Sequence, residues 1–579
     1  METIGLVQRP SSSPSWRTSP YRPPDLNGPV DVAFDPLPPD FTETPIFVLF
    51  ASAAARDPAA CAVVTGDARV SYDMLRRRAL ALAQRIDAVT PADAAVAILL
   101  GQSADAVVAL LACLAARRVA LILHAEHPPE RNAAILRDAA PAAIVVAESA
   151  PLPGGLPADV VRIAPTGADI PETQAAWQPP QPAAPDAPAI VLYTSGSAGR
   201  PKGVVLSQFC MLYRVQRNIA GSHLNRADRL LPLSALGTVN GCSYIIAILL
   251  AGGTLLQFAL TSLRDLRAVL RRERITVLIG LPRILDMLAE ADSHAALASL
   301  RMVRSTGEGM RRSELDALRV ALPPHCHINI TYGMTESSVT HWWVPQGYSG
   351  SEALIPAGYP CDGVDFAILG EHGEPVADGA VGEIVVRSRV VALGEFSHGR
   401  CVPGRFSPDP TDPACRIFAT GDLVRMRPDG MLQFVARGDR QIKLNGQRVE
   451  PAEIEEVMRH IPGVAEAVIV TGGTGVSPIV LGFIVPTPGT EPQSLHTAVR
   501  QALRQRLPRI MRPARIVMLA RLPRLPSGKV DRQALLAGTP RRASLLRPPL
   551  AALAARCREL VGRTFFLEKD AAQNGRQDR

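Results

Sequence analysis

The chain has few aromatic and few charged side chains. Aromatic residues make up 4% of its 579 residues, and Asp, Glu, Lys and Arg together make up 20%. Hydrophobic residues account for 47%, a composition that is typical of a globular protein and excludes a disordered or fibrous one. The length exceeds the size at which one hydrophobic core stops growing, so we expect two or more domains.

Closely spaced pairs of cysteines are also lacking. None of the nine cysteines stands in a Cys-x-x-Cys spacing, which argues against a zinc site and against a disulfide framework. The odd count suits a reducing compartment. Residues 1–14 lack the basic start and the apolar core of a signal peptide, so we expect the mature protein to begin at Met1 and to be cytoplasmic.

Long apolar runs are rare, and the strongest one is Tyr244–Leu260. Gly252, Gly253 and Gln257 interrupt it, so we predict a buried helix, a tight turn and a core strand and no membrane span. The formal net charge is +8, which fits nucleic-acid, membrane or acidic small-molecule partners. The basic residues form no block with interleaved aromatics, so we expect a contribution to solubility and no nucleic-acid binding.

The order of patterns along the chain predicts four parts. Residues 1–44 are rich in Ser and Pro and are predicted to be a disordered arm. From 45 to 438, helix-like runs alternate with short apolar runs, which predicts a large α/β domain with βαβ layers and a small β-rich subdomain; within it, the Pro- and Ala-rich segment 151–188 is predicted to be a surface loop or linker. Residues 439–537 have the pattern of a compact α+β domain, and 538–579 form a helical, basic tail.

A loop rich in glycine and hydroxyl groups follows a predicted strand, Ala189–Tyr193. Hydroxyls, flexible glycines and exposed backbone N–H groups can wrap phosphate oxygens, and Lys202 adds a positive charge. Lys202 precedes Gly203 rather than Ser or Thr, so the loop is not a Walker loop. Alone, such a loop is more often a plain turn. Its candidate phosphate contacts are Thr194, Ser195, Gly196 and Ser197.

Together with five later motifs, this loop resembles the signatures of the adenylate-forming superfamily, which includes acyl-CoA synthetases, adenylation domains of nonribosomal peptide synthetases, and luciferases. The resemblance covers roughly residues 45–537. It implies a small, mobile C-terminal domain after the large one, and ATP and Mg²⁺ as cofactors. The five motifs are Ser305–Gly309, Tyr332–Glu336, Thr420–Asp422, Arg437–Gly446 and Leu525–Arg532.

The second of these motifs supplies the predicted contacts to the base and the phosphates. Tyr332 can stack on adenine, the hydroxyl of Thr335 can hold the α-phosphate, and the carboxylate of Glu336 can bind a magnesium ion that bridges the phosphates. Gly307 and Glu308 belong to the glycine-rich stretch that, by the resemblance, lies along the nucleotide and forms one wall of the acyl pocket.

The resemblance assigns the remaining roles. Asp422 accepts both ribose hydroxyl hydrogens, Arg437 adds a ribose contact, and Asp439 lies at the hinge between the domains. Lys529 is the predicted catalytic residue, because a lysine that bridges the carboxylate and the phosphate stabilises the negative charge of the transition state. Lys202 and Thr335 are the other catalytic candidates.

Some positions depart from the family's pattern. Ile330 stands where the family often has Asn, and Ala436 stands where it has Gly before the arginine of the hinge motif. Arg117 and Arg118 replace a usual Gly-Ala in a helix-to-strand turn, which affects local geometry and not catalysis.

The predicted function is ATP-dependent adenylation of a small carboxylic acid, followed by thioester formation on CoA or on the phosphopantetheine of a stand-alone carrier protein. The tail has no Gly-Gly-x-Ser-like attachment site, so a carrier must act in trans. The stretch Thr238–Gly241 offers no carboxylate for a substrate ammonium, which favours an aryl or aliphatic acid. The alternatives are an amino-acid adenylation domain of a nonribosomal peptide pathway and a non-catalytic nucleotide-binding relative.

Overall fold

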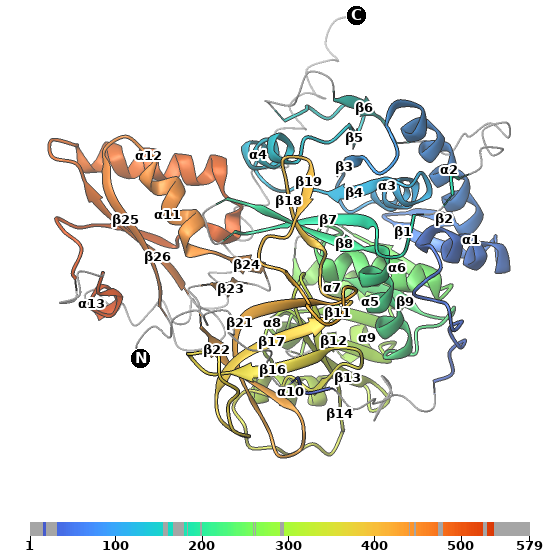
Figure 1. The fold of residues 1–579 in the computed structure, drawn as a ribbon. Helices are drawn as coiled ribbons and strands as arrows, with labels where there is room; N and C mark the ends of the chain where they lie inside the picture. The colour runs from blue at the N-terminus through green and yellow to red at the C-terminus, as the bar shows by residue number, and fades with distance from the viewer. Residues whose placement is uncertain are drawn as a thin grey trace, which may run out of the picture.

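The computed structural model consists of a large body and a smaller unit that begins at Gln441 and lies beside it (Figure 1). The body is built in layers, with helices between two sheets and on their outer faces. The structure describes residues 16–18, 32–153, 160–165, 179–181, 183–196, 200–258, 260, 262–289, 294–438, 441–444, 447–472, 479–524 and 530–537.

The first sheet of the body carries the strand that leads into the phosphate loop. Its strands are β3 Ala95–Leu99, β4 Val119–Ile122, β5 Ala143–Val146, β6 Val161–Ile163, β7 Pro188–Thr194, β8 Lys202–Ser207, β18 Gly394–Ser397 and β19 Arg400–Val402. They lie in the order β19-β18-β8-β7-β4-β3-β5-β6, and β7, β4, β3, β5 and β6 run parallel. The prediction of a loop for 151–188 is wrong at β6, because these three residues pair with β5 at the edge of the sheet.

The second sheet is parallel over most of its width. Its strands are β1 Cys61–Thr65, β2 Ala68–Ser71, β9 Arg229–Pro232, β10 Thr254–Gln257, β11 Val277–Gly280, β12 Met302–Ser305, β13 His327–Gly333, β14 Ser338–Val344 and β15 Tyr359–Pro360. Their order is β15-β14-β13-β12-β11-β9-β10-β1-β2. The strands β12 and β13, which precede two of the predicted motifs, are parallel neighbours, so their carboxyl ends meet at one edge.

Helices cover the sheets on both sides. Their bounds are α1 Ile46–Arg56, α2 Tyr72–Val89, α3 Ala104–Ala115, α4 Pro129–Ala139, α5 Gln208–Ala220, α6 Val239–Leu250, α7 Leu263–Arg272, α8 Pro282–Leu288, α9 His294–Leu297 and α10 Arg312–Ala321. Helices α1, α2, α3, α5 and α6 share the core between the sheets, α4 packs on the outer face of the first sheet, and α7 to α10 pack on the outer face of the second.

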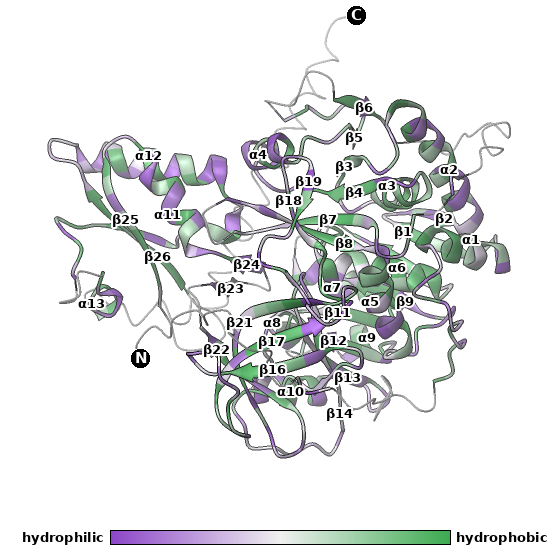
Figure 2. Cartoon of the chain, viewed as in Figure 1, coloured by the Kyte–Doolittle hydropathy of each residue, from purple (hydrophilic) through white to green (hydrophobic). Residues whose placement is uncertain are grey.

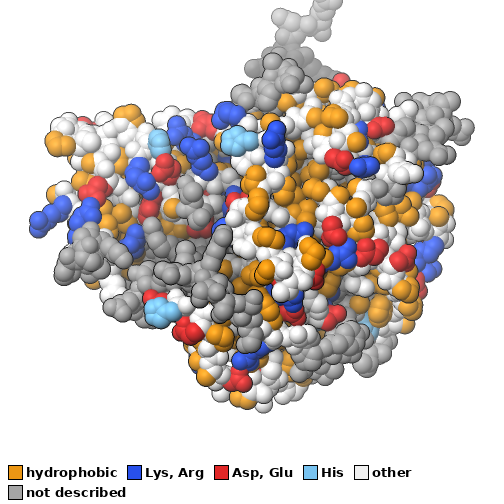
Figure 3. Space-filling view, in the orientation of Figure 1, with side chains coloured by type: hydrophobic (Ala, Val, Ile, Leu, Met, Phe, Trp, Pro, Cys, Tyr) orange, Lys and Arg blue, Asp and Glu red, His pale blue; other side chains and the backbone are white. Residues whose placement is uncertain are grey.

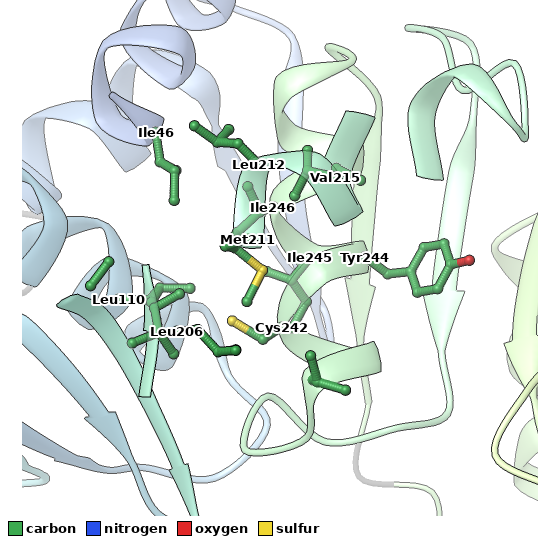
Figure 4. Packing of buried hydrophobic residues seen from close by; sticks show 14 of the residues in the cluster. Ile46, Leu110, Leu206, Met211, Leu212, Val215, Cys242, Tyr244, Ile245 and Ile246 are labelled. Carbon is green, nitrogen blue, oxygen red and sulfur yellow. The ribbon is translucent and has the colours of Figure 1, made fainter. Parts of the chain in front are cut away.

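The central core is apolar and closely packed. Leu206 of β8, Met211 of α5 and Ile245 of α6 meet there with residues of α1 and α3 (Figure 4). The side chain of Thr238 caps α6 by accepting a hydrogen bond from the backbone of Gly241 at 3.0 Å. This cap fixes the start of α6, and therefore the position of the polar residues in its first turn.

The apolar run from Tyr244 to Leu260 has the structure that its glycines predict. It contains most of α6, a turn with Gly252 at φ 83°, and β10. In the part of the chain that the structure describes, no helix has both the length and the apolar character needed to cross a membrane. On the face drawn in Figure 3, Lys and Arg side chains are interspersed with acidic ones.

An antiparallel sheet forms the β-rich part of the body. Its strands are β16 Asp365–Leu369, β17 Gly382–Ser388, β20 Ser407–Pro408, β21 Arg416–Met426 and β22 Leu432–Arg437. They lie in the order β16-β17-β21-β20, with β22 also paired to β21. Parts of the predicted arm pack on the body: Arg17 pairs with Phe366 through its backbone, and Phe41 is buried.

The small unit has its own core of helices packed on a sheet. Its elements are β23 Ile442–Leu444, β24 Gln447–Val449, α11 Pro451–Arg459, β25 Val464–Gly472, β26 Ile479–Pro486, α12 Pro492–Arg506, a 3-10 helix Arg509–Met511, β27 Arg515–Met518 and α13 Arg532–Ala537. Figure 2 shows hydrophilic residues along α12 and hydrophobic ones along β26. The predicted fold class, a large α/β domain followed by a small α+β domain, is confirmed; the exact domain boundaries stay predictions.

Candidate active site

The predicted nucleotide-binding residues converge on one cavity of about 200 Å³, at the carboxyl ends of β7, β12 and β13 and beside β21 and β22. Glu308 lines a neighbouring cavity that shares Gly307, Tyr332 and Arg437 with the first. Lys202 reaches the first cavity through its contact with Glu336. The predicted residues that line the first cavity are Thr194, Ser195, Gly307, Tyr332, Thr335, Glu336, Asp422 and Arg437.

The end of β7 supplies free polar groups and a tight turn. The hydroxyl of Thr194 is buried and has no hydrogen-bond partner within the described residues. Ser195 donates its hydroxyl hydrogen to the backbone oxygen of Arg448, at 2.5 Å. A Cβ atom on Gly196 would lie 2.1 Å from the backbone oxygen of Arg200, so this position requires glycine. Ser197 lies outside the described residues, and its role stays a prediction.

Glu336 is a buried acidic group of the cavity wall, with 1% of its side chain exposed. Its carboxylate accepts from Arg448 at 2.7 Å and from Arg405 at 3.2 Å, and lies 3.7 Å from Nζ of Lys202. Burial alone raises the pKa of Glu336, but Arg448, Lys202 and Arg405 outweigh it and lower the pKa to about 2. Glu336 is therefore a permanent anion in a cationic setting.

The surroundings of Lys202 disfavour its charged form, whereas those of Glu336 favour the charged form of that residue. Burial lowers the pKa of Lys202 from its ordinary value, and Arg448 and Arg405 act in the same direction, while Glu336 and Glu395 oppose them. Glu395 lies 3.4 Å from Nζ of Lys202. The amine is thus held at the cavity wall by two carboxylates.

Asp422 and Arg437 face each other because they are paired across β21 and β22. Nη1 of Arg437 donates to one oxygen of the Asp422 carboxylate at 2.5 Å, and the hydroxyl of Tyr332 donates to the other at 2.5 Å. The pKa of Tyr332 is raised well above its ordinary value by burial and then by Asp422. This fully buried carboxylate therefore holds two donors, which is the capacity that a ribose diol requires.

Arg214, on α5, holds the loop that carries Thr335 and Glu336. It donates to the backbone oxygens of Met334 and Thr335, each at 3.0 Å, and to the hydroxyl of Ser338 at 3.1 Å. A single buried side chain thereby holds the middle of the predicted phosphate and magnesium motif and the strand that follows it.

The first turn of α6 lines the side of the cavity that is predicted to hold the acyl group. Thr238, Val239 and Asn240 line it, as the sequence predicts for this stretch. The side-chain amide of Asn240 donates to the hydroxyl of Thr306 at 3.2 Å. His124 packs so closely on Gly237 that a Cβ there would lie 2.7 Å from its Nε2, and burial lowers the pKa of His124 to about 4. Among the described residues, the acidic ones that line the cavity are Glu336 and Asp422.

Contacts between the body and the small unit run through the same region. Arg448, which bonds Glu336 and Ser195, belongs to β24 of the small unit. Arg131 of α4 forms a buried ion pair with Glu453 of α11. Burial raises the pKa of Glu453, and Arg131 opposes this shift. The position of the small unit is therefore linked to the charges around Glu336.

Sequence reasoning missed several arginines of this site, among them Arg214, Arg405 and Arg448. One sequence feature could have pointed to Arg214, because it is a basic residue between apolar ones in a helix whose residues are mostly buried. Arg405 and Arg448 lie in loops or short strands, where a single arginine carries no pattern. Lys529 and Asp439 lie outside the described residues, so their catalytic and hinge roles stay predictions.

The residues present fit a nucleotide and a magnesium ion. Thr194 provides a buried hydroxyl without a partner, which suits a phosphate oxygen. No group of three or more His, Cys, Asp or Glu side chains suited to a metal occurs within the described ranges. Mg²⁺ is commonly held by one or two carboxylates together with substrate phosphates, so Glu336 suffices as the protein's carboxylate ligand.

Known proteins share this sequence and fold. A plipastatin synthase from Bacillus subtilis is 31% identical over 493 residues, which cover 84% of this chain and 13% of that protein. Phosphinothricin tripeptide synthetase PhsB of Streptomyces viridochromogenes is 33% identical over 517 residues, which cover 86% of this chain and 43% of that protein. The chain thus spans less than half the length of these relatives.

Solved structures extend the likeness to the fold. IdnL1 is 27% identical with a TM-score of 0.69, over 84% of this chain and all of that one (100%). The artificially fused adenylation-PCP di-domain NpsA-ThdA from Klebsiella oxytoca is 20% identical with a TM-score of 0.69, over 82% of this chain and 93% of that one. Residues 50–394 match the model of the AMP-binding enzymes, and 453–529 match that of the AMP-binding enzyme C-terminal domain. The chain therefore belongs to the AMP-binding enzyme family of AMP-forming, adenylating ligases.

Proposed function

We propose that this chain activates a carboxylic acid as its acyl-adenylate and passes the acyl group to the phosphopantetheine thiol of a carrier protein, as an adenylation unit of the peptide-synthetase type. The observation that carries the proposal is the single cavity shared by the hydroxyls at the end of β7, the buried Glu336 with its cations, and the Asp422–Arg437 pair. The relatives, which include a plipastatin synthase and a phosphinothricin tripeptide synthetase, support the carrier over CoA.

The first half-reaction forms the acyl-adenylate. A carboxylate oxygen of the acid attacks the α-phosphorus of ATP, and the bond from that phosphorus to the bridging oxygen breaks, which releases pyrophosphate. Negative charge builds up on the α-phosphate and on the leaving group, so a fixed lysine there stabilises the transition state. Lys529 is the residue that we assign to this task, and Thr335 holds the α-phosphate.

The remaining site residues bind the nucleotide. Thr194 and Ser195 contact the phosphates, Tyr332 stacks on adenine, and Asp422 accepts the ribose hydroxyls. Glu336 would hold Mg²⁺, which when bound neutralises charge on the phosphates. In the second half-reaction the carrier thiol loses its proton to solvent, the resulting thiolate attacks the acyl carbon, and the bond from that carbon to the AMP oxygen breaks, which releases AMP.

The relatives favour an amino acid as the substrate, whereas the sequence alone favoured an aryl or aliphatic acid. In an amino acid, the ammonium needs an acceptor, and the side-chain oxygen of Asn240 is a neutral one beside Thr306. An acid without an amine is the second candidate, because Glu336 and Asp422, the acidic residues lining the described cavity, both have nucleotide roles in the proposal.

Acid-dependent exchange of pyrophosphate into ATP tests the first half-reaction. The panel pairs each α-amino acid with the same acid lacking the amine, and Lys529→Ala serves as the catalytic control. Activity with one member of each pair decides between the two substrate classes. Thioester formation is then measured on a phosphopantetheinylated carrier and on CoA. No exchange over the whole panel, with Lys529→Ala equal to wild type, would refute the proposal.

A further inference from the structure

Arg304 is a buried arginine in the wall of the cavity, on the side of α6. It lies on β12 and is 1% exposed. Its guanidinium donates to Oδ1 of Asn218 and to the hydroxyl of Ser222, each at 2.8 Å, and lies 3.2 Å from Nε2 of His341. Nε of Arg304 is buried and has no hydrogen-bond partner among the described residues.

The partners of Arg304 carry no negative charge. Asn218 and Ser222 are neutral, and burial followed by the charge of Arg304 lowers the pKa of His341 well below its ordinary value. Burial lowers the pKa of Arg304 to about 9, which still leaves a cation at neutral pH. Within the described part of the chain, no carboxylate forms an ion pair with it. A buried cation without a counter-charge is unfavourable, so this one calls for an anion from the cavity.

The arginines near Arg304 do not supply the negative charge that it lacks. Arg217 forms its own ion pair with Asp362. Arg214 donates hydrogen bonds to backbone oxygens and to a hydroxyl. Burial lowers the pKa of Arg214, and the carboxylate of Glu336 opposes this shift. Both arginines also line the cavity. The acyl side therefore carries an excess of positive charge.

Tyr244 supplies a second unsatisfied donor at the same place. Its hydroxyl is buried without a hydrogen-bond partner in the described residues, and its ring lies 5.1 Å from Cζ of Arg304. Figure 4 shows the side chain of Tyr244 pointing away from the apolar cluster of Met211 and Ile246. Tyr244 also lines the cavity. The guanidinium of Arg304 on β12 thus lies over the ring of Tyr244 on α6, and both residues line the same cavity.

We infer that Arg304 and Tyr244 form the receptor for a second anionic group of the substrate, so that the activated acid also carries a distal carboxylate. The inference rests on the proposed function, because only a substrate seated in this cavity reaches both residues. A guanidinium N–H and a phenol O–H can donate to the same carboxylate, which forms charge-assisted hydrogen bonds.

The position of Arg304 close to the acyl wall limits the length of the acid. Arg304 lies within β12, which ends at Ser305, and Thr306 follows directly after the strand. Thr306 contacts Asn240, and Gly307 belongs to the predicted wall along the nucleotide. Because Arg304 is only two residues from Thr306 in the sequence, we expect the second carboxylate to belong to a short dicarboxylic acid, with or without an α-amine.

The test compares acids that differ only at the distal end: glutamate with norvaline, and glutarate with pentanoate, each by ATP–pyrophosphate exchange. In the wild type we expect kcat/KM for the acid with the distal carboxylate to exceed that of its methyl counterpart at least roughly a hundredfold. Arg304→Met should bring the ratio close to one. Tyr244→Phe, which removes a hydroxyl that has no hydrogen-bond partner in the described part of the chain, should lower the ratio roughly tenfold.

Two buried residues away from the cavity serve as matched controls. Tyr72 bonds the backbone oxygens of Leu249 and Gly253, and Arg118 pairs with Asp87. Tyr72→Phe and Arg118→Met should change stability and leave the ratio unchanged. If Arg304 has only a structural role, Arg304→Met should lower kcat/KM by the same factor for both acids of each pair.

Equal rates for both members in the wild type, or an unchanged ratio in Arg304→Met, would overturn the inference. If Arg304→Met does not fold, the ratio in Tyr244→Phe decides, and an unchanged ratio there counts against it. Exchange with other acids but without a distal preference refutes this inference alone. No exchange with any acid refutes the proposed function, and this inference with it.

Discussion

Replacing Glu336 with Gln removes the carboxylate that Lys202, Arg405 and Arg448 share while keeping the shape of the side chain. The change leaves buried or half-buried cations close together without this counter-charge. The ordinary pKa of Glu336 is 4.5 and its pKa in the folded chain is about 2. At about 1.4 kcal/mol per pKa unit, this difference corresponds to about 3 kcal/mol in favour of the ionised side chain.

The pH dependence has a definite sign. The folded-state pKa of Glu336 lies below the unfolded value, so the stabilisation is complete above pH 4.5 and is lost as the pH falls towards about 2. We therefore expect Glu336→Gln to lower the free energy of unfolding by about 3 kcal/mol at pH 7. The difference from wild type should stay constant down to about pH 5 and shrink below it.

Urea unfolding of both proteins at several pH values measures this difference. Glu371→Gln, at an exposed position, is the matched control and should unfold like wild type. Equal stability of Glu336→Gln and wild type at pH 7 would show that the cations are neutralised elsewhere, by Glu395 and Glu450. A difference that grows on acidification would contradict the assigned pKa direction.

Asp422→Asn should raise the KM for ATP roughly tenfold or more in the exchange assay, because an amide cannot accept from both ribose hydroxyls; an unchanged KM would remove the ribose role. Arg131→Met should lower the free energy of unfolding by about 3–5 kcal/mol by leaving Glu453 buried without its partner, whereas Arg131→Met combined with Glu453→Met should recover most of this loss in thermal unfolding. Lys529→Ala should slow adenylation at least about a hundredfold while transfer from supplied acyl-adenylate to the carrier keeps its rate; equal losses in both steps would contradict its assignment.

The sequence predicts those elements whose own residues form a clear local pattern. The predicted strand at 189–193 is the centre of β7. It is a short, continuous apolar run that leads directly into a glycine-rich loop, so the sequence itself specifies it. The strand β6 has three residues and exists through its pairing with β5, so no local pattern could reveal it.

The positions at which this chain departs from the family's usual residues were harder to interpret. Arg117, where the family usually has Gly, has a φ of 56°, so the turn keeps its left-handed backbone without glycine. Arg117 pairs with Asp93 across the turn, while Arg118 bonds Thr90 and pairs with Asp87. These partners are distant in the sequence, and their contribution becomes visible only once the fold brings them to the turn.

The same limit applies to the charges of the site. Motifs identified Glu336 and Asp422, because short spacings carry their signal. The cations around Glu336 come from three separate segments, and Arg448 belongs to the small unit. Tertiary structure alone assembles them.

Both carboxylates with proposed ligand roles are already bonded to the protein, Glu336 to Arg448 and Asp422 to Tyr332. The cavity of about 200 Å³ is also smaller than the roughly 300–1,000 Å³ typical of ligand sites. If Glu336 binds Mg²⁺ and Asp422 binds the ribose, Arg448 and Tyr332 must give up these bonds. Because Arg448 is part of the small unit, nucleotide binding and the position of that unit then compete for the same carboxylate.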